Sequence, residues 1–282
     1  MPGYFDDTSV IRRVHREYLV GLGGARALLM QAAHPVAFAG FFMSTGALED
    51  PYPRLARTAA VLDTILFGER VDADAATAAV RRVHTRMRGT LPEPVGRFPA
   101  GTPWAADDPD LLLWIIATLA DSGALVYRRY VGELTPAELD AYWEDWRVVG
   151  SLFGLEPAQM PVGFAGLEAY AREMLSGDVL HVSPTARELG RRIVLRPPVP
   201  LLARPLLEVA NFVVIGWLPA RIRRQYRLWW DPARTIVLHT GAESTRRLLV
   251  PVLPAEVRRR TPRAGTGSHR PHTNVRRPVP TA

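Results

Sequence analysis

Residues 25–42 have the sequence ARALLMQAAHPVAFAGFF, and this stretch decides the fold class. Apolar side chains fill every turn, and Arg26, Gln31 and His34 are the strongest interruptions. A helix that is apolar on all sides belongs in the centre of a protein, covered by other helices. Proline has no backbone N–H and collides with the preceding turn, so Pro35 predicts a kink beside His34. The stretch therefore predicts a buried central helix that is kinked at His34.

Helix signals on both sides of this stretch predict an all-α protein. Helices are expected to begin at Asp, Thr or Pro signals and to end at glycine. The glycine cluster at 21–24 is expected to separate a first helix, over residues 8–22, from the apolar one. The Pro- and Gly-rich residues 90–108 predict a long loop, of the kind that often forms a lid or an entrance. No segment alternates with period two, so no sheet is expected. The remaining expected helices cover residues 54–66, 72–88, 109–131, 135–153, 161–175, 183–194, 202–217, 219–226, 241–250 and 254–260.

The charge of the chain is concentrated at its C-terminal end. The 282 residues include 35 basic residues, all of them arginine, and 28 acids. Seven arginines and no acid lie in residues 258–282, so the rest of the chain is balanced. We predict one helical domain over residues 1–260 and a disordered, basic tail over residues 261–282. No specific nucleic-acid partner is expected, and contact with a membrane surface stays open.

The sequence excludes several classes of site. There is no cysteine, which removes disulfides, iron–sulfur clusters, thiolate-bound haem and covalent haem attachment. Phosphate-loop, zinc-protease, nucleophile-elbow and di-iron motifs are missing from the sequence. The first residues lack a basic and then apolar leader pattern, and the apolar run at 209–218 is too short to span a bilayer. We therefore expect no transmembrane span and a cytoplasmic location.

One histidine stands out as a candidate ligand. In VRRVHTRMRG, residues 80–89, helical spacing places His84 on one stripe with Val80, Val83 and Met87. An imidazole on such a stripe can bind haem iron, or it can be a packed core histidine with a backbone hydrogen bond. His34 allows the same two interpretations. From composition and spacing alone, the chain is a large helical protein with two buried histidines.

A resemblance to a known family favours the haem interpretation. The chain resembles the oxygenase family that includes the bacterial latex clearing protein, a rubber oxygenase, and a fungal oxygenase of mycophenolic acid biosynthesis. The matching runs are GARALLMQAAHP at 24–35, DPYPRLART at 50–58 with FG at 67–68, VRRVHTRMRG at 80–89, DPDLLLW at 108–114 and LPARIR at 218–223. The resemblance implies b-type haem in a globin-like helical core and oxidation of an apolar substrate by dioxygen. Relatives cleave double bonds in polyisoprene or in a prenyl side chain.

The resemblance also implies roles for individual residues. His84 matches the proximal ligand of the iron, and Arg81 belongs to the same motif. Arg54 and Thr58 match residues on the distal side, where dioxygen binds. Arg57 stands where the rubber-cleaving branch has a lysine. Arg54, Arg57 and Arg81 are thus the expected partners of the haem propionates.

The match is incomplete on the distal side. The rubber-cleaving branch has a distal glutamate with no clear counterpart here, and His34 lies in about the same region as a substitute. Ile116 stands where bacterial relatives often have a histidine. Three hypotheses follow. The protein is a haem b oxygenase with catalytic His34, Arg54 and Thr58, or a haem protein for storage, sensing or electron transfer, or a cofactor-free helical scaffold.

Overall fold

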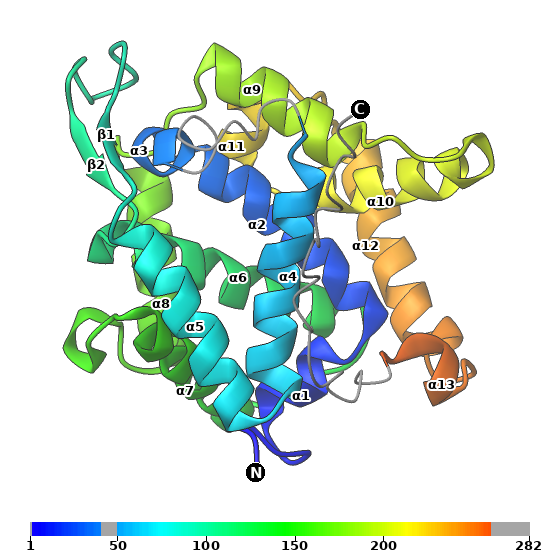
Figure 1. Ribbon diagram of the computed structural model, residues 1–282. Helices are drawn as coiled ribbons and strands as arrows, with labels where there is room; N and C mark the ends of the chain where they lie inside the picture. Colours follow the sequence, from blue (N-terminus) through cyan, green and yellow to red (C-terminus); the bar gives the residue numbers. More distant parts are fainter. Residues whose placement is uncertain (1, 41–49, 261–282) are drawn as a thin grey trace, which may run out of the picture.

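The computed structural model describes residues 2–40 and 50–260, and their helices confirm the all-α prediction (Figure 1). Two short strands, β1 (Arg88–Thr90) and β2 (Pro103–Ala105), form a hairpin. The helices are α1 (Val10–His15), α2 (Gly21–Ala32), α3 (Pro35–Phe38), α4 (Tyr52–Phe67), α5 (Arg70–His84), α6 (Pro109–Tyr130), α7 (Pro136–Phe153), α8 (Gly163–Ser176), α9 (Pro184–Gly190), α10 (Arg204–Trp217), α11 (Ala220–Gln225), α12 (Pro232–Ser244) and α13 (Ala255–Arg258).

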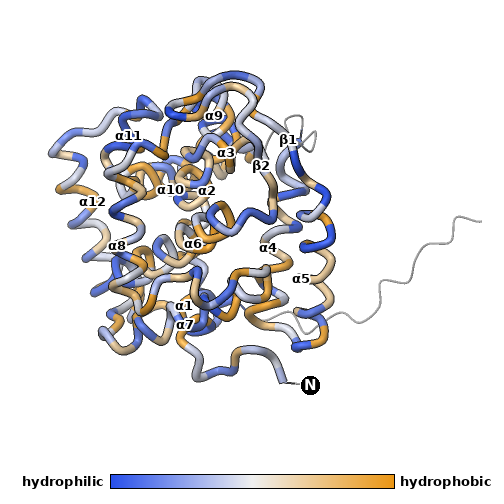
Figure 2. Tube along the Cα trace, turned by 90° about the vertical axis from the view of Figure 1, so that its left-hand side faces the viewer, coloured by the Kyte–Doolittle hydropathy of each residue, from blue (hydrophilic) through white to orange (hydrophobic). Residues whose placement is uncertain are grey.

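Helix α6 runs through the middle of the molecule. Figure 2 shows α4 and α5 on one side of it and α10 to α12 on the other. Asp108 caps its first turn by accepting from the Asp110 N–H at 2.9 Å. The helix is long and apolar enough to span a membrane by length and composition, but 72% of its most apolar window is buried. Burial of this kind is typical of a core helix, because its apolar side chains are already covered by protein.

Helix α2 packs directly on α6, as the apolar stretch predicts. A side chain at Gly23 would place its Cβ 2.8 Å from the Ser122 carbonyl oxygen, so the two backbones approach closely. The predicted glycine break at 21–24 is wrong, because these residues form the first turn of α2. Glycine costs some helix stability, and here the cost is offset by close packing. The kink is confirmed as a full break between α2 and α3 at His34 and Pro35.

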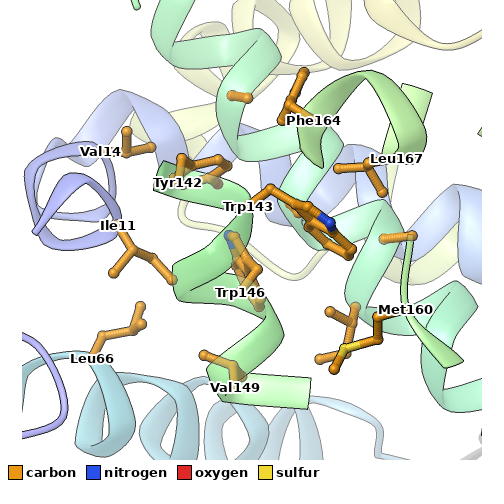
Figure 3. Packing of buried hydrophobic residues seen from close by; sticks show 14 of the residues in the cluster. Ile11, Val14, Leu66, Tyr142, Trp143, Trp146, Val149, Met160, Phe164 and Leu167 are labelled. Atoms are coloured by element: carbon orange, nitrogen blue, oxygen red, sulfur yellow. The ribbon is translucent and has the colours of Figure 1, made fainter. Parts of the chain in front are cut away.

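Two apolar clusters lie on either side of α6. The larger joins α1 and the end of α4 to α6, α7 and α8, and Figure 3 shows Tyr142, Trp143 and Trp146 at its centre. The second joins α2 to α9, α10 and α11 and receives Trp114 from α6. Aromatic side chains of this size bury large areas, so they dominate the packing energy of the first cluster.

The expected helix at 241–250 begins earlier, because α12 starts at Pro232.

The expected helix at 72–88 ends at His84, and the chain then enters β1. Gly89 pairs with Trp104 across the hairpin. A Cβ at Gly89 would lie 2.7 Å from the Trp104 ring, so glycine is required for this contact rather than for a helix end. The predicted long loop at 90–108 therefore contains part of a hairpin. Its two strands are too short to show an alternating pattern, so the sequence did not predict them.

The last described residues of the chain pack against the segment around Glu17. Glu17 is buried, and Arg259 donates to its carboxylate at 2.8 Å while Arg258 lies 3.4 Å away. The Arg260 N–H donates to the Arg16 carbonyl at 2.7 Å. Arg258, Arg259 and Arg260 belong to the basic end of the sequence by charge. Their contacts nevertheless make them part of the helical domain. The tail predicted at 261–282 lies outside the described residues.

Candidate functional site

His84 is the last residue of α5, and its surroundings leave one ring nitrogen without a partner. Its Nδ1 is buried and has no hydrogen bond within the described part of the chain. Burial, and then the positive charge of Arg54, lower the pKa of His84, while Asp107 opposes this shift. The imidazole is therefore neutral at pH 7, and neutral imidazole is the form that binds iron.

The predicted stripe around His84 needs correction. Because α5 stops at His84, Met87 lies in the following turn, and Val83 is 55% exposed. The stripe that faces the protein is made instead by Ala73, Thr77, Val80 and His84, of which the first two are fully covered. The side of α5 that carries His84 is thus turned inward, as predicted, but with different neighbours.

The first turns of α4 bring a second group of predicted residues to this region. Arg54 is partly buried, and burial followed by the charge of Arg57 lowers its pKa to about 10. Arg57 and Thr58 are exposed. The Thr58 hydroxyl donates to the Arg54 carbonyl at 3.1 Å, a common bond of threonine within a helix. Because Arg54 shifts the pKa of His84, α4 and the end of α5 share one electrostatic environment.

His34 occupies the break between α2 and α3. Its Nδ1 accepts from the Ala37 N–H at 3.3 Å, so the imidazole caps α3. The ring lies 5.7 Å from the Phe98 ring, centre to centre. Burial lowers its pKa to about 4, with smaller effects from its own backbone hydrogen bond, Asp108 and Arg97. With Nδ1 used by the cap, Nε2 is the nitrogen through which His34 can act.

Two aspartates at the start of α6 connect the histidines. Asp107 acts on the pKa of His84, and Asp108 acts on that of His34. Asp107 also accepts from Arg88 at 3.0 Å. In the sequence, Asp108 belongs to the family-like run DPDLLLW and Asp107 directly precedes it. Asp108 alone caps α6, so Asp107 is not needed for capping.

Other predicted residues lie apart from this group. The Arg81 guanidinium lies close to Gly154 at the end of α7. Ile116 packs into the larger apolar cluster, so that position contributes to the core here. A third histidine, His15, was missed by the sequence analysis. Its Nε2 lies 3.0 Å from the Tyr142 hydroxyl, and burial lowers its pKa to about 3. With this partner, His15 is a structural histidine.

The family model described as ER-bound oxygenase mpaB/B'/Rubber oxygenase, catalytic domain, matches residues 12–250. This chain belongs to that family. The resemblance found in the sequence is thereby confirmed, and the chain carries an oxygenase catalytic domain. In this oxygenase domain the matched region includes every helix from α2 to α12, and thus all the residues described above.

Two mycobacterial proteins are similar to this oxygenase domain along most of its length. They are the uncharacterized protein Mb2261 of Mycobacterium bovis and the uncharacterized protein Rv2237 of Mycobacterium tuberculosis. Each is 26% identical over 218 residues, which cover 74% of this chain and 81% of the relative. No solved structure matches the chain.

The residues of the site fit two needs of a haem, a nitrogen ligand for the iron and a positive charge for a propionate. Within residues 2–40 and 50–260, no three His, Asp or Glu side chains gather in a way that could hold a bare ion. A haem needs only one or two protein ligands, because its own nitrogens supply the others. An unpartnered imidazole nitrogen beside a partly buried arginine provides one ligand and one positive charge for a propionate.

Proposed function

We propose that this oxygenase domain binds haem b through His84 and oxidises an apolar substrate of the isoprenoid class with dioxygen. The observation that carries the proposal is the buried, unpartnered Nδ1 of His84 next to Arg54. Rubber oxygenases of the family use haem, which adds support. Bound haem iron would supply the activation of dioxygen.

His84 would hold the iron as a neutral ligand. Protonation would remove the lone pair that binds a metal, so the lowered pKa keeps the ligand competent below pH 7. The negative charge of Asp107 raises the pKa of this ring and would favour a more basic imidazole. The effects of Arg54 and Asp107 on the pKa of His84 oppose each other, and burial, the largest effect, keeps the ring neutral.

Arg54, Arg57 and Arg81 would hold the two propionates. Arg54 is the strongest candidate because its charge already acts on His84. Arg57 stands one turn further along α4, and its exposure leaves it free to turn toward a carboxylate. Arg81 is assigned by its motif alone, since its side chain lies beside Gly154. Charge-assisted hydrogen bonds of this kind are about twice as strong as neutral ones.

His34 and Thr58 would act on the distal side. His34 would offer Nε2, which in a neutral ring with an accepting Nδ1 carries the proton. It could donate that proton in a hydrogen bond to a bound oxygen atom. Thr58 would first have to release the Arg54 carbonyl, because its hydroxyl has one hydrogen to donate. His34 is therefore the better donor of the two.

The absorption spectrum of protein reconstituted with haem tests the ligand. We expect an intense Soret band that His84→Ala removes, while His181→Ala, at an exposed histidine, retains it. To separate loss of ligand from loss of fold, His84→Gly would be reconstituted with added imidazole, and the band should return. A band that persists unchanged in His84→Ala would overturn the assignment of the ligand. A well-folded protein that gives no band would overturn the haem itself.

A second measurement separates turnover from binding alone. His34→Asn keeps a side chain that can cap α3 but removes the imidazole. If His34 were the second iron ligand, the substitution would change a low-spin spectrum to a high-spin one. That result would favour storage, sensing or electron transfer, because both axial positions would be filled. For an oxygenase we expect an unchanged spin state and slower consumption of dioxygen with a polyisoprene substrate.

A further inference from the structure

A hollow lined by arginines lies on the surface of α9 and the π-helical turn that follows it. Its volume is about 490 Å³, and its charged lining consists of Arg187, Arg191, Arg192, Arg196 and Glu188. Arg187 is oriented by its Nε, which donates to the Gln225 carbonyl at 2.8 Å. Four arginines against one glutamate make the hollow strongly positive. Arginine binds phosphate through paired hydrogen bonds, so the hollow suits a phosphate group.

The chain that leaves this hollow carries an exposed apolar surface. Leu201 is 72% exposed, Leu202 95%, Leu206 73% and Val209 62%. The segment between α9 and α10 extends away from the body of the molecule at the right of Figure 1. The charged groups on this stretch are Arg204 and Glu208, both exposed. Leu201 and Leu202 lie on this segment, and Leu206 and Val209 lie on the first turns of α10. Large aliphatic side chains gathered in this way indicate a surface that contacts something apolar.

A buried hydrogen bond holds the two features together. The Asn211 side chain, on α10, donates to the Leu195 carbonyl at 2.9 Å. Leu195 ends the turn that carries Arg191 and Arg192, and Arg196 follows it. Asn211 lies two residues after Val209 on the same helix. The arginine hollow and the leucine surface are therefore anchored to each other at their junction, although three prolines separate Arg196 from Leu201 in sequence.

We propose that this region is a docking surface for a membrane that contains anionic phospholipid. The hollow takes a lipid phosphate, and Leu201, Leu202, Leu206 and Val209 enter the acyl boundary beside it. Apolar side chains and neighbouring arginines are the two features that hold peripheral proteins on anionic bilayers. The proposal does not depend on haem, since none of these residues belongs to the candidate haem site.

Charge decides between a bilayer and a second copy of the chain. Pairing two copies through this region by a two-fold axis would bring the arginine hollows of both near the same interface. Like charges there would repel each other. An anionic lipid surface supplies charge of the opposite sign to every arginine at once. The leucines alone would fit either occupant, but the adjoining arginines favour lipid.

Vesicle sedimentation with the full chain tests the proposal. The probes are phosphatidylcholine vesicles with and without phosphatidylglycerol. We expect binding that requires phosphatidylglycerol, and a loss of affinity of about tenfold or more in the double variant Leu201→Ser, Leu202→Ser. The double variant Arg191→Gln, Arg196→Gln should lose about tenfold as well, since each arginine near an anionic surface adds to binding.

Matched control variants distinguish binding through this surface from nonspecific binding to vesicles. Leu248→Ser with Leu249→Ser removes two other exposed leucines, and Arg128→Gln with Arg172→Gln removes two exposed arginines elsewhere. Both should bind like the parent. Equal binding by all variants would assign the attraction to another part of the chain and overturn the proposal. A parent that ignores vesicles but forms dimers, lost in Leu201→Ser, Leu202→Ser, would assign the surface to a second copy and overturn it equally.

Discussion

The α2–α6 interface and the His84 region each contain a polar group in an apolar setting. The two groups differ in whether they have hydrogen-bond partners. Arg26 in α2 is buried, and its guanidinium donates to Asp121 at 2.7 Å, to the Ser122 hydroxyl at 2.6 Å and to the Trp217 carbonyl at 2.9 Å. His84 in α5 keeps a buried Nδ1 without a partner. A satisfied polar group stabilises the fold, whereas an unsatisfied one requires another explanation. Arg26 is thus explained by the fold, whereas the unpartnered Nδ1 of His84 is the observation on which the proposed haem site rests.

Substitution of Arg26 is expected to have the largest effect on stability, and it tests the structural role of this residue. Arg26→Ala would leave the Asp121 charge and the buried Ser122 hydroxyl without their partner. We expect the free energy of unfolding to fall by about 3–5 kcal/mol. Urea denaturation measures it, and Arg128→Ala, at an exposed arginine of α6, is the control that should change stability by less than about 0.5 kcal/mol. A small loss for Arg26→Ala would remove the basis of the comparison.

His34 lies between the two cases, since one ring nitrogen is bonded and the other is available. Its pKa of about 4 in the folded state is below the ordinary value of 6.5. Between these values the unfolded chain binds more protons, so stability falls as the pH falls. We expect this one group to account for a loss of about 3 kcal/mol between pH 7 and pH 4.

The substitution His34→Asn isolates that contribution. It keeps a cap for α3 and removes the titrating ring, so the difference in unfolding free energy between wild type and variant should shrink or reverse toward pH 4. Denaturation at several pH values gives this difference. If the difference stayed constant with pH, His34 would not be held neutral by burial.

Two adjacent glycines test how closely α2 and α6 approach. At Gly23 a Cβ would meet the Ser122 backbone at 2.8 Å, whereas at Gly24 nothing lies within 4 Å. We expect Gly23→Ala to lower the unfolding free energy by about 2 kcal/mol through overpacking. Gly24→Ala should raise it by about 0.5–1 kcal/mol, because alanine favours helix. Equal effects in thermal denaturation would contradict the close contact.

Thr58→Ala should have the smallest effect on folding. Thr58 is exposed, and its hydroxyl bonds only to its own helix among the described contacts. We expect a change in unfolding free energy within about 0.5 kcal/mol. The same variant should lower dioxygen consumption if Thr58 acts on the distal side. A large loss of stability would instead assign Thr58 to the fold.

The sequence predicted the helices well where local signals were strong. Thr135 and Glu138 form a capping box at the start of α7, where the sequence predicted a helix to begin, and Asp108 caps α6. It failed where a distant residue decides the outcome. Gly89 seemed to end a helix, but Trp104 from the opposite strand determines its conformation. Gly23 seemed to break a helix, but its role is set by Ser122, about a hundred residues away in the chain.

The candidate site shows the same division. His84, Arg54 and Thr58 were predicted through motifs, because each lies inside a contiguous run that resembles the family. The effects of Asp107 and Asp108 on the two histidines, and the contact of His15 with Tyr142, were missed, since they depend on which helices meet in the fold. Electrostatic effects between residues that are distant in sequence produce no periodic pattern that the sequence could reveal. A motif can therefore indicate a candidate ligand without indicating the charged groups that surround it.

The contact between Glu17 and Arg259 has a consequence for the order of events during synthesis. The two residues are separated by 242 positions, so the acid is made long before its partner. At the usual rate of translation the interval is on the order of 10–50 s. Throughout that time the N-terminal segment holds a carboxylate that must stay in water. The contact that covers Glu17 can thus form only after Arg259 has been made.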